Sequence, residues 1–270
     1  MTNLVSANPG RTASVAKSTV VTLVVMVGLV VTTSAAQNPE RDSSAISTLQ
    51  SAITALGGSN VIAGIQDCIL TGSILNQNGT NTKFTWTTSG SEFRIETTAR
   101  NGGTNVFVSG HGSPAWIMNG NTSALNYYMA RANLPFYLPP YVLLQELQNP
   151  IYTLRYIGAV QVNGTSVIQI HISDDSDPVG TLVTPQEWYF DSVSFLPVRV
   201  QVREPANESA ANYGTATYDM SQFVPVNGVM VPYKISYSND TTNEVLSIGT
   251  VTFNSGVSQS IFDPPQRGTR

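Results

Sequence analysis

Few side chains in this chain have the type and spacing needed for chemistry. The sequence contains two histidines, His111 and His171, and one cysteine, Cys68. His111 lies close to Ser113 in a flexible Gly-His-Gly-Ser turn, and acyl transfer does require a nucleophile beside a base. The residue after this serine is Pro114, however, so the Gly-x-Ser-x-Gly pattern that exposes a nucleophilic serine is missing. We therefore interpret His111 as a turn residue without a catalytic role.

The other polar candidates give equally weak signals. His171 alternates with isoleucines along a strand-like run, which predicts an exposed or hydrogen-bonded histidine on the polar face. Cys68 begins an apolar run and is expected to be a buried thiol. Residues 173–180 include three aspartates but lack the ligand order and following glutamate of a calcium loop, so we expect a solvated acidic loop. We predict no catalytic residue, no metal site and no cofactor.

The composition is that of an exported, non-nucleic-acid-binding protein. Charged residues make up only 11% of the chain, and 13 Lys and Arg against 17 Asp and Glu give a net charge of −4. Binding to nucleic acid or to an anionic membrane surface requires clustered cations, which this chain does not have. The single cysteine excludes an intrachain disulfide, so stability must come from a hydrophobic core.

The N-terminus has the features of a secretory signal peptide. Arg11 and Lys17 precede an uncharged apolar run, and the small residues Ser34 and Ala36 match the positions that a signal peptidase reads. We therefore expect residues 1–36 to be removed and the protein to be exported. The alternative is an uncleaved membrane anchor, because the uncharged stretch is long enough to span a bilayer.

The elements that must position any functional residue are mostly strands. The helical spacing of Ile46, Leu49 and Ile53 predicts one helix over residues 42–56, ended by a pair of glycines. From Cys68 onward, short runs with period-two alternation are separated by Asn-Gly and similar turns, which predicts a meander instead of βαβ units. Such short connections leave no room for crossover helices, so the sheet should be antiparallel.

Two runs in the second half of the chain show the alternation most clearly. Val198, Val200 and Val202 alternate with polar residues, and so do Tyr233 and Ile235. Each strand therefore has one apolar face, which must be covered by a helix, by a second sheet or by a ligand. One helix covers roughly 10 Å, which is less than the width of a meander of many strands. We therefore predict an apolar cavity to which these five residues contribute.

An aromatic, proline-rich segment, residues 127–141, interrupts the meander. Its prolines exclude a central strand, and Pro139 and Pro140 favour the start of a short amphipathic helix. The segment has two interpretations, a lid over a cavity or a plug that fills one mouth of the barrel as core. The candidate ligand-binding residues in and before this segment are Trp116, Tyr127, Tyr128, Phe136, Tyr137, Leu138 and Tyr141.

Two stretches of the sequence match the motifs of a known family. The first is Ala55-Leu-Gly-Gly58, which leads into Thr71-Gly72. The second comprises Trp188-Tyr-Phe-Asp191, Leu196-Pro-Val-Arg199, Gly228-Val-Met-Val-Pro-Tyr233 and Phe262-Asp-Pro-Pro265. In these stretches and in the order of its elements the chain resembles the carriers that sort outer-membrane lipoproteins, the LolA/LolB-like group of periplasmic lipid-binding proteins.

The resemblance implies a mainly β fold, in which an incomplete antiparallel β-barrel or curved sheet surrounds an apolar cavity and a helix and loops form the lid. It also implies a carrier that binds acyl chains, does no chemistry and needs no cofactor. A membrane-bound donor or acceptor protein is a candidate partner. Arg94, in Phe93-Arg-Ile-Glu96, is the candidate for the arginine that latches the lid in that group.

We expect one mature domain, residues 37–265, and a short C-terminal tail, residues 266–270. The leading hypothesis is an exported periplasmic carrier or chaperone that binds a lipid or the acyl chains of a lipoprotein. The alternative is a structural or protein-interaction β domain of the cell envelope, whose apolar face is filled by its own side chains. An enzyme is a third alternative, which the scarcity of catalytic side chains disfavours.

Overall fold

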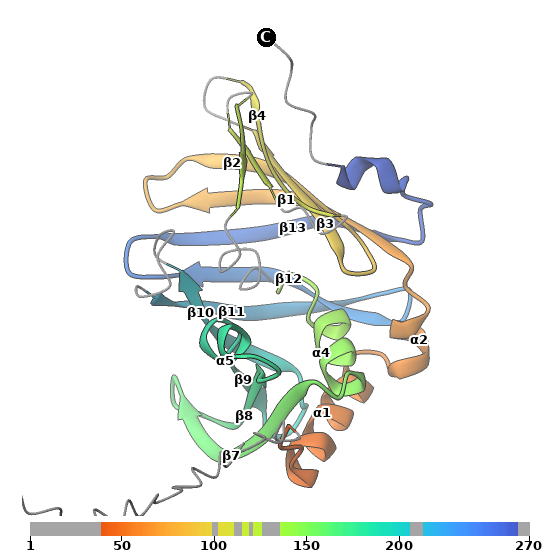
Figure 1. Cartoon of the computed structure of the whole chain (residues 1–270), viewed down its shortest axis with the longest axis vertical. Helices are drawn as coiled ribbons and strands as arrows, with labels where there is room; N and C mark the ends of the chain where they lie inside the picture. The colour runs from red at the N-terminus through yellow and green to blue at the C-terminus, as the bar shows by residue number, and fades with distance from the viewer. Residues whose placement is uncertain are drawn as a thin grey trace, which may run out of the picture. The chain divides into compact units, whose positions relative to one another are not determined.

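The computed structural model describes residues 39–98, 102–110, 115–118, 121–125, 136–205 and 213–263. Their strands join in a single antiparallel sheet of 13 strands, which curves strongly but does not close into a barrel (Figure 1). The predicted fold class, a mainly β protein built on a curved antiparallel sheet, is therefore confirmed.

Two meanders form the sheet, and the pairing of β1 with β13 joins them. The first meander comprises β1 (Asp67–Asn76), β2 (Asn81–Ser89), β3 (Glu92–Thr98), β4 (Thr104–Ser109), β5 (Ala115–Met118) and β6 (Asn121–Ala124). The second comprises β7 (Tyr152–Val162), β8 (Thr165–Asp174), β9 (Gln186–Asp191), β10 (Pro197–Pro205), β11 (Tyr213–Val226), β12 (Val229–Ser238) and β13 (Asn243–Phe253). The expected meander is confirmed, with β6 as an unexpected edge strand.

The described helices are short and few compared with the strands. They are α1 (Ser43–Ala55), α2 (Ser59–Ala63), α4 (Pro139–Gln148) and α5 (Pro178–Val183), with a 3-10 turn, η1 (Gln259–Phe262), after the last strand. The predicted N-terminal helix is confirmed as α1, and the helix predicted to begin at the two prolines is confirmed as α4.

The expectation of a solvated acidic loop over residues 173–180 is wrong. Asp177 accepts hydrogen bonds from the backbone amides of Val179 and Gly180, at 2.8 and 2.7 Å, and so caps α5. An aspartate followed by proline is a helix-start signal, and in Asp177-Pro178 this signal outweighs the loop-like composition of the segment.

Two of the short runs that carry the resemblance fix local structure, one at the end of α1 and one in the β9–β10 turn. Gly57 has φ +128°, and a Cβ at this position would lie 2.4 Å from the carbonyl oxygen of Gly228. The end of α1 therefore docks directly on the β11–β12 turn, where Met230 N donates to Leu56 O at 2.9 Å. The Asp191 carboxylate accepts from the amide of Ser194 at 2.7 Å and holds the turn between β9 and β10.

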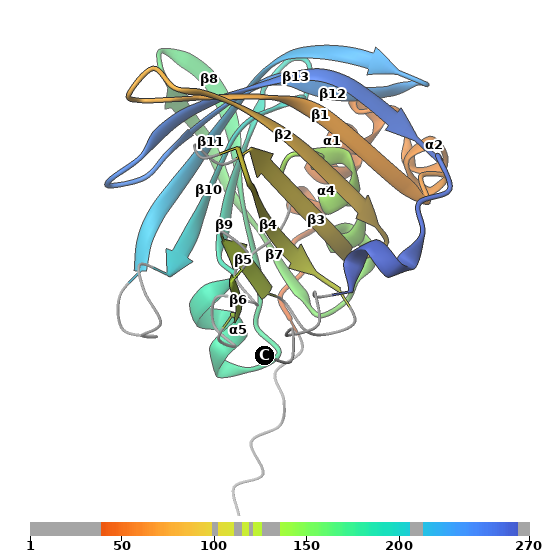
Figure 2. The same ribbon diagram turned by 90° about the horizontal axis from the view of Figure 1, so that it is seen from above.

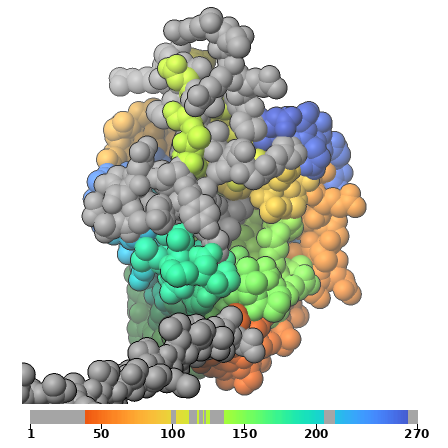
Figure 3. All heavy atoms as spheres, in the orientation of Figure 1, coloured from red at the N-terminus to blue at the C-terminus, as the bar shows by residue number. Residues whose placement is uncertain are grey.

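α1, α2 and α4 gather at one end of the concave face (Figure 2). Figures 1 and 2 show α1 and α2 beside the β11–β12 turn, whereas the β1–β2 and β12–β13 turns lie at the opposite end of the strands. α4 packs on α1, α2 and β12, and the three helices share one side of the molecule in Figure 3. Leu49 of α1 and Leu143 of α4 are fully buried, so this end of the concave face is a packed core.

Several predictions fall on residues that the structure does not describe. The signal peptide of residues 1–36, its alternative as an anchor, the tail of residues 266–270 and the turn around His111 all lie outside the described residues. Among the helices that are described, none is both long and apolar enough to cross a membrane.

Candidate functional site

A cavity of about 280 Å³ lies at the end of the concave face that the helices leave uncovered. Its walls come from β1, β3 and β4 on one side and from β10, β11, β12 and β13 on the other, with the residues before α4 between them. The apolar lining includes Ile74, Phe93, Ile95, Phe107 and Leu246.

The strand register explains why these side chains converge. Ile74 of β1 lies opposite Leu246 of β13, and Tyr218 of β11 lies opposite Tyr237 of β12. Residues in direct register on antiparallel strands project from the same face of the sheet. The alternation predicted for single strands therefore continues from strand to strand and produces one continuous concave wall.

Phe136 and Tyr137 bridge the two halves of the sheet inside its curve. The Phe136 ring lies 6.1 Å from that of Trp188 and 5.4 Å from that of Tyr218, measured between centroids. The Tyr137 ring lies 6.1 Å from that of Trp86 on the other half of the sheet. Because Phe136 is only 3% exposed and both residues line the cavity, this part of the aromatic segment is at once core and cavity wall.

Two carboxylates form the polar end of the cavity. Glu204 of β10 accepts hydrogen bonds from the Tyr237 hydroxyl at 2.8 Å and from Asn239 Nδ2 at 2.9 Å. Glu244 of β13 has no hydrogen-bond or ion-pair partner among the described residues, and burial raises its pKa. Burial, together with the neighbouring Glu204, also raises the pKa of Tyr237.

The tyrosines around these carboxylates are neutral at any physiological pH. Burial raises the pKa of Tyr137 to about 12, with smaller contributions from Glu244 and Glu204. Burial also raises the pKa of Tyr218 well above its ordinary value. Their hydroxyls and ring faces are therefore available for polar contacts and for packing, but none of Tyr137, Tyr218 and Tyr237 is an activated nucleophile. Among the described residues, no group of His, Cys, Asp and Glu side chains is arranged to hold a metal ion.

An open, polar groove of about 920 Å³ adjoins the cavity. Cavity and groove share Ile74, Thr97, Asn105 and Glu244, so these residues mark the boundary between them. Most other groove residues are Asn and Thr side chains near the β1–β2 turn, together with Lys83. The site therefore runs from an apolar interior through a carboxylate to a polar exit.

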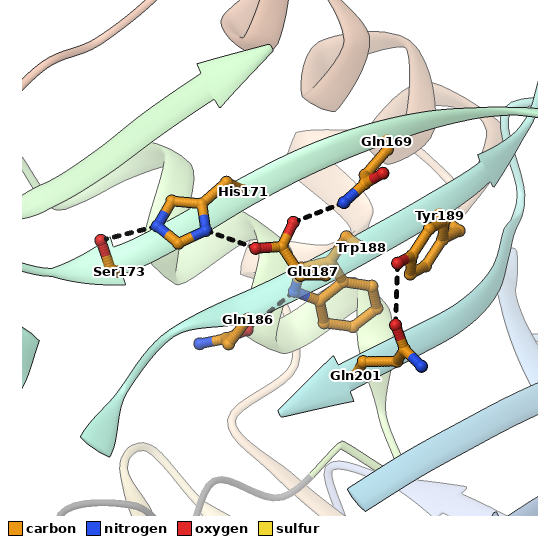
Figure 4. A network of polar contacts seen from close by, with 8 residues as sticks. All are labelled: Gln169, His171, Ser173, Gln186, Glu187, Trp188, Tyr189 and Gln201. Carbon is orange, nitrogen blue, oxygen red and sulfur yellow. Dashed lines mark hydrogen bonds and ion pairs between the residues drawn. The ribbon is translucent and has the colours of Figure 1, made fainter. Parts of the chain in front are cut away.

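A second polar cluster lies on the opposite, outer face of the sheet, beside a groove of about 480 Å³. His171 Nδ1 lies 2.6 Å from Glu187 Oε1, and His171 Nε2 lies 3.2 Å from Ser173 Oγ (Figure 4). Gln169 Nε2 donates to the other oxygen of Glu187 at 2.8 Å. The expectation that His171 is hydrogen-bonded on the polar face is confirmed.

This outer cluster has the Ser-His-Glu connectivity of a catalytic triad but not its surroundings. Ser173 is only 2% exposed, which hinders access of a substrate to its hydroxyl. The backbone amide of Asp174, the residue after this serine, donates to Thr184 Oγ1 at 2.8 Å, so it is not available to an oxyanion. Although burial opposes ionisation, hydrogen bonds from His171 and Gln169 lower the pKa of Glu187. We interpret the cluster as a stabilising link between β8 and β9.

The predicted ligand-binding residues have different locations. Phe136 and Tyr137 line the cavity, Leu138 is fully buried behind them, and Tyr141 is half-buried on α4. The strand residues do not line the cavity: Val200, Val202 and Ile235 are buried in the core, and Val198 and Tyr233 are half-buried. Tyr127, Tyr128 and the side chain of Trp116 lie outside the described residues.

Arg94, the candidate latch, lies on the outer face of β3. Its neighbours Phe93 and Ile95 line the cavity on the concave face, so the arginine between them points away from it. Its guanidinium donates to the carbonyl oxygen of Ile261 at 3.1 Å and pairs with Glu96 at 2.5 Å. The described contacts of Arg94 therefore connect β3 with η1.

The polar residues of the cavity were not predicted from the sequence, although the pattern around one of them placed it on the apolar face. Glu204 follows Val200 and Val202 at two-residue spacing, so the alternation that places the valines inside places Glu204 inside as well. Glu244 and Asn105 gave a weaker signal, because each precedes the first apolar residue on its own face of the strand, whereas Glu204 follows two valines.

Comparisons with known proteins agree with this fold. No family model matches the sequence, and no curated protein matches it. The chain is similar to a solved structure described as an outer membrane lipoprotein-sorting protein domain from Vibrio parahaemolyticus, with 12% identity, a TM-score of 0.55, and coverage of 81% of this chain and 97% of that one. It is also similar to a LolA superfamily protein from Nitrosomonas europaea, with 10% identity, a TM-score of 0.53, and coverage of 82% and 97%. The predicted LolA-like fold is confirmed.

Proposed function

We propose that this chain, which has the fold of LolA-like lipoprotein-sorting domains, is an exported carrier or chaperone for a hydrophobic ligand. The ligand, a lipid or the acyl chains of a lipoprotein, binds in the cavity at the uncovered end of the concave face. Because one fold can support many functions, the proposal depends on the cavity and not on the fold alone.

The observation that carries the proposal is the difference between the two ends of the concave face. At one end α1 and α4 fill the curve of the sheet with buried side chains. At the other end apolar side chains such as Ile95 and Phe107 surround about 280 Å³ that the described residues leave empty. A purely structural domain would fill such a space with its own side chains, because protein interiors are close-packed.

The size and lining of the cavity suit part of an acyl chain. Its volume of about 280 Å³ is close to the lower limit of roughly 300–1,000 Å³ for small-molecule sites. Each CH₂ group that leaves water contributes about 0.8 kcal/mol to binding. Affinity should therefore increase with the length of chain that the cavity can enclose.

The remaining parts of the proposal concern the route of the protein and its cargo. Residues 1–36 act as a cleaved signal peptide, residues 37–265 form the mature carrier, and residues 266–270 are a tail. The carrier works in the periplasm, where a membrane-bound protein donates or accepts the cargo. The small net negative charge of the chain fits a protein that does not bind anionic membranes by itself.

Titration with a fluorescent fatty-acyl probe tests the proposal. Ile95→Trp adds volume to the cavity wall, whereas Leu75→Trp adds a similar volume to a side chain that is 48% exposed. We expect saturable binding near one equivalent in the wild-type protein and in Leu75→Trp. Ile95→Trp should bind about tenfold more weakly, which corresponds to losing the burial of about two CH₂ groups.

Thermal unfolding of the two variants is the control, because a cavity-filling variant that still folds should melt within a few degrees of the wild type. If the wild-type protein shows no saturable binding of the probe, the carrier proposal is wrong and the structural-domain alternative takes its place.

A further inference from the structure

The polar end of the cavity offers hydrogen-bond acceptors that lack donors. Glu244 has no described partner, and Asn105 Oδ1 is a buried oxygen without one. Both residues lie at the boundary between the apolar cavity and the outer groove. A buried acceptor that loses its water without gaining a donor is unfavourable. A ligand that donates hydrogen bonds at this boundary would remove that cost.

Glu204 adds a third acceptor and is held in place by the protein. The bonds from Tyr237 and Asn239 both end on its Oε2, so its Oε1 is left without a described partner. Tyr237 also lies in direct register with Glu244 on the neighbouring strand. The two carboxylates therefore flank one tyrosine, and none of the described residues that line the cavity is a lysine or an arginine.

Aromatic rings cover the same end of the cavity. The ring centroids of Tyr218 and Tyr237 are 5.1 Å apart, and those of Tyr137 and Tyr218 are 6.4 Å apart. The face of an aromatic ring attracts a cation, and the attraction grows when water is excluded. Carboxylates and tyrosine rings thus favour the same kind of group, one that is positively charged and donates hydrogen bonds.

We propose that the ligand of this cavity is an amphiphile with an amine or ammonium head group, which Glu244, Glu204 and the three tyrosine rings hold at the mouth of the cavity. The alkyl part lies in the apolar interior and any further polar part of the head extends into the outer groove. This inference rests on the proposed carrier function, since it specifies the head group of the ligand that the carrier binds.

Other head groups fit the same residues less well. A carboxylate or phosphate would face two glutamates, and the one lysine among the described groove residues, Lys83, does not line the cavity itself. A neutral alcohol could donate a hydrogen bond to one acceptor, but it would leave the charge of Glu244 unbalanced at low local polarity. An amine or ammonium group satisfies the acceptors and balances the charge together.

The test uses four amphiphiles that share one alkyl chain and end in a primary amine, a trimethylammonium, an alcohol or a carboxylate. Each competes with the fluorescent fatty-acyl probe for the protein, below the concentration at which micelles form. We expect the amine to displace the probe at roughly tenfold lower concentration than the alcohol, the effect of one charge-assisted hydrogen bond. The trimethylammonium has the charge but no N–H donor, so it should compete better than the alcohol and less well than the amine. The carboxylate should compete least well.

Variants assign this preference to the site. Glu244→Gln should reduce the advantage of the amine over the alcohol to about twofold or less while the acyl probe still binds. Tyr237→Phe keeps the ring but removes the hydroxyl that holds Glu204 in place. It should therefore reduce the advantage of the amine over the alcohol in part. The matched control is Glu187→Gln, which removes a carboxylate on the outer face and should leave the advantage unchanged.

Each outcome is decisive. Equal competition by amine and alcohol in the wild-type protein, or a preference that survives Glu244→Gln, would overturn the head-group inference and leave the carrier function intact. A protein that shows no saturable binding of the acyl probe would overturn the carrier function and the inference with it.

Discussion

The outer cluster around Glu187 and the polar end of the cavity around Glu244 contain similar side chains but differ in how their polar groups are satisfied. Glu187 receives hydrogen bonds from His171 and Gln169 on its two oxygens, and the second nitrogen of His171 is close to Ser173. Glu244 has no described partner. A cluster that satisfies itself adds stability, whereas acceptors left open beside a cavity are a sign that a ligand completes them.

The comparison also shows why residue types alone are a poor guide to function. The outer cluster has the more suggestive residues, a serine, a histidine and a glutamate in one line (Figure 4). The cavity end has glutamates and tyrosines, which match no catalytic motif. Unused hydrogen-bonding capacity and the apolar lining of the adjoining space distinguish the cavity end from the outer cluster, whose groove is lined mostly by polar residues. Both properties depend on the assembled sheet.

The largest loss of stability should come from shortening Phe136, which lies between the cavity and the core. Phe136→Ala removes a ring that is 3% exposed and packs on Trp188 and Tyr218. We expect the free energy of unfolding, measured by urea denaturation, to fall by about 3–5 kcal/mol, the usual cost of emptying an aromatic core position. Val193→Ala, at a residue that is 86% exposed, should change it little. If Phe136→Ala instead weakens ligand binding with stability unchanged, the segment is a lid and not a plug.

A third carboxylate, Glu146 of α4, extends the comparison into the packed core. It is 1% exposed, Gln186 donates to its Oε1 at 2.6 Å, and its Oε2 has no partner. Burial raises the pKa of Glu146 from 4.5 to about 8, so the folded protein keeps a proton that the unfolded chain loses at lower pH. The stability that this protonated group provides is complete below about pH 4.5 and declines as the pH rises to about 8.

Glu146→Gln should therefore remove this decline. The variant should be more stable than the wild type above about pH 8 and should differ less from it in acid, when both are unfolded with urea across the pH range. If the stability of both proteins depends on pH in the same way, the ionised Glu146 is stabilised by water or by a cation. The core beside α4 is then accessible to water.

Local patterns were enough to predict most of the fold. The helical spacing in α1 and the alternation in β10 and β12 are properties of single elements, and the short turns between strands determined the antiparallel pairing. α5 and β6 were missed because each is short and its signal, Asp177 before a proline for α5, competes with that of an ordinary loop.

The position of the cavity could not be predicted in the same way. Val200, Val202 and Glu204 share one face of β10, yet the valines are buried in the core and Glu204 lines the cavity. The difference arises because α1 and α4 cover only part of the width of the sheet, at the end where Gly57 docks against Gly228. Periodicity gives the face on which a residue lies, but not what covers that face.

The smallest expected changes in stability come from substituting Glu187 and Glu244, and they compare the two carboxylates directly. Glu187→Gln weakens two hydrogen bonds to a charged acceptor and should lower the free energy of unfolding by about 1 kcal/mol at pH 7. Glu244→Gln removes a half-buried charge that has no described partner, so it should leave stability unchanged or raise it by a few tenths of a kcal/mol. Paired urea denaturation curves measure both. If Glu244→Gln destabilises the protein as much as Glu187→Gln does, Glu244 has a partner within the protein, and its open acceptors no longer indicate a ligand. If only Glu187→Gln lowers the free energy of unfolding, the outer carboxylate stabilises the fold and the inner carboxylate does not.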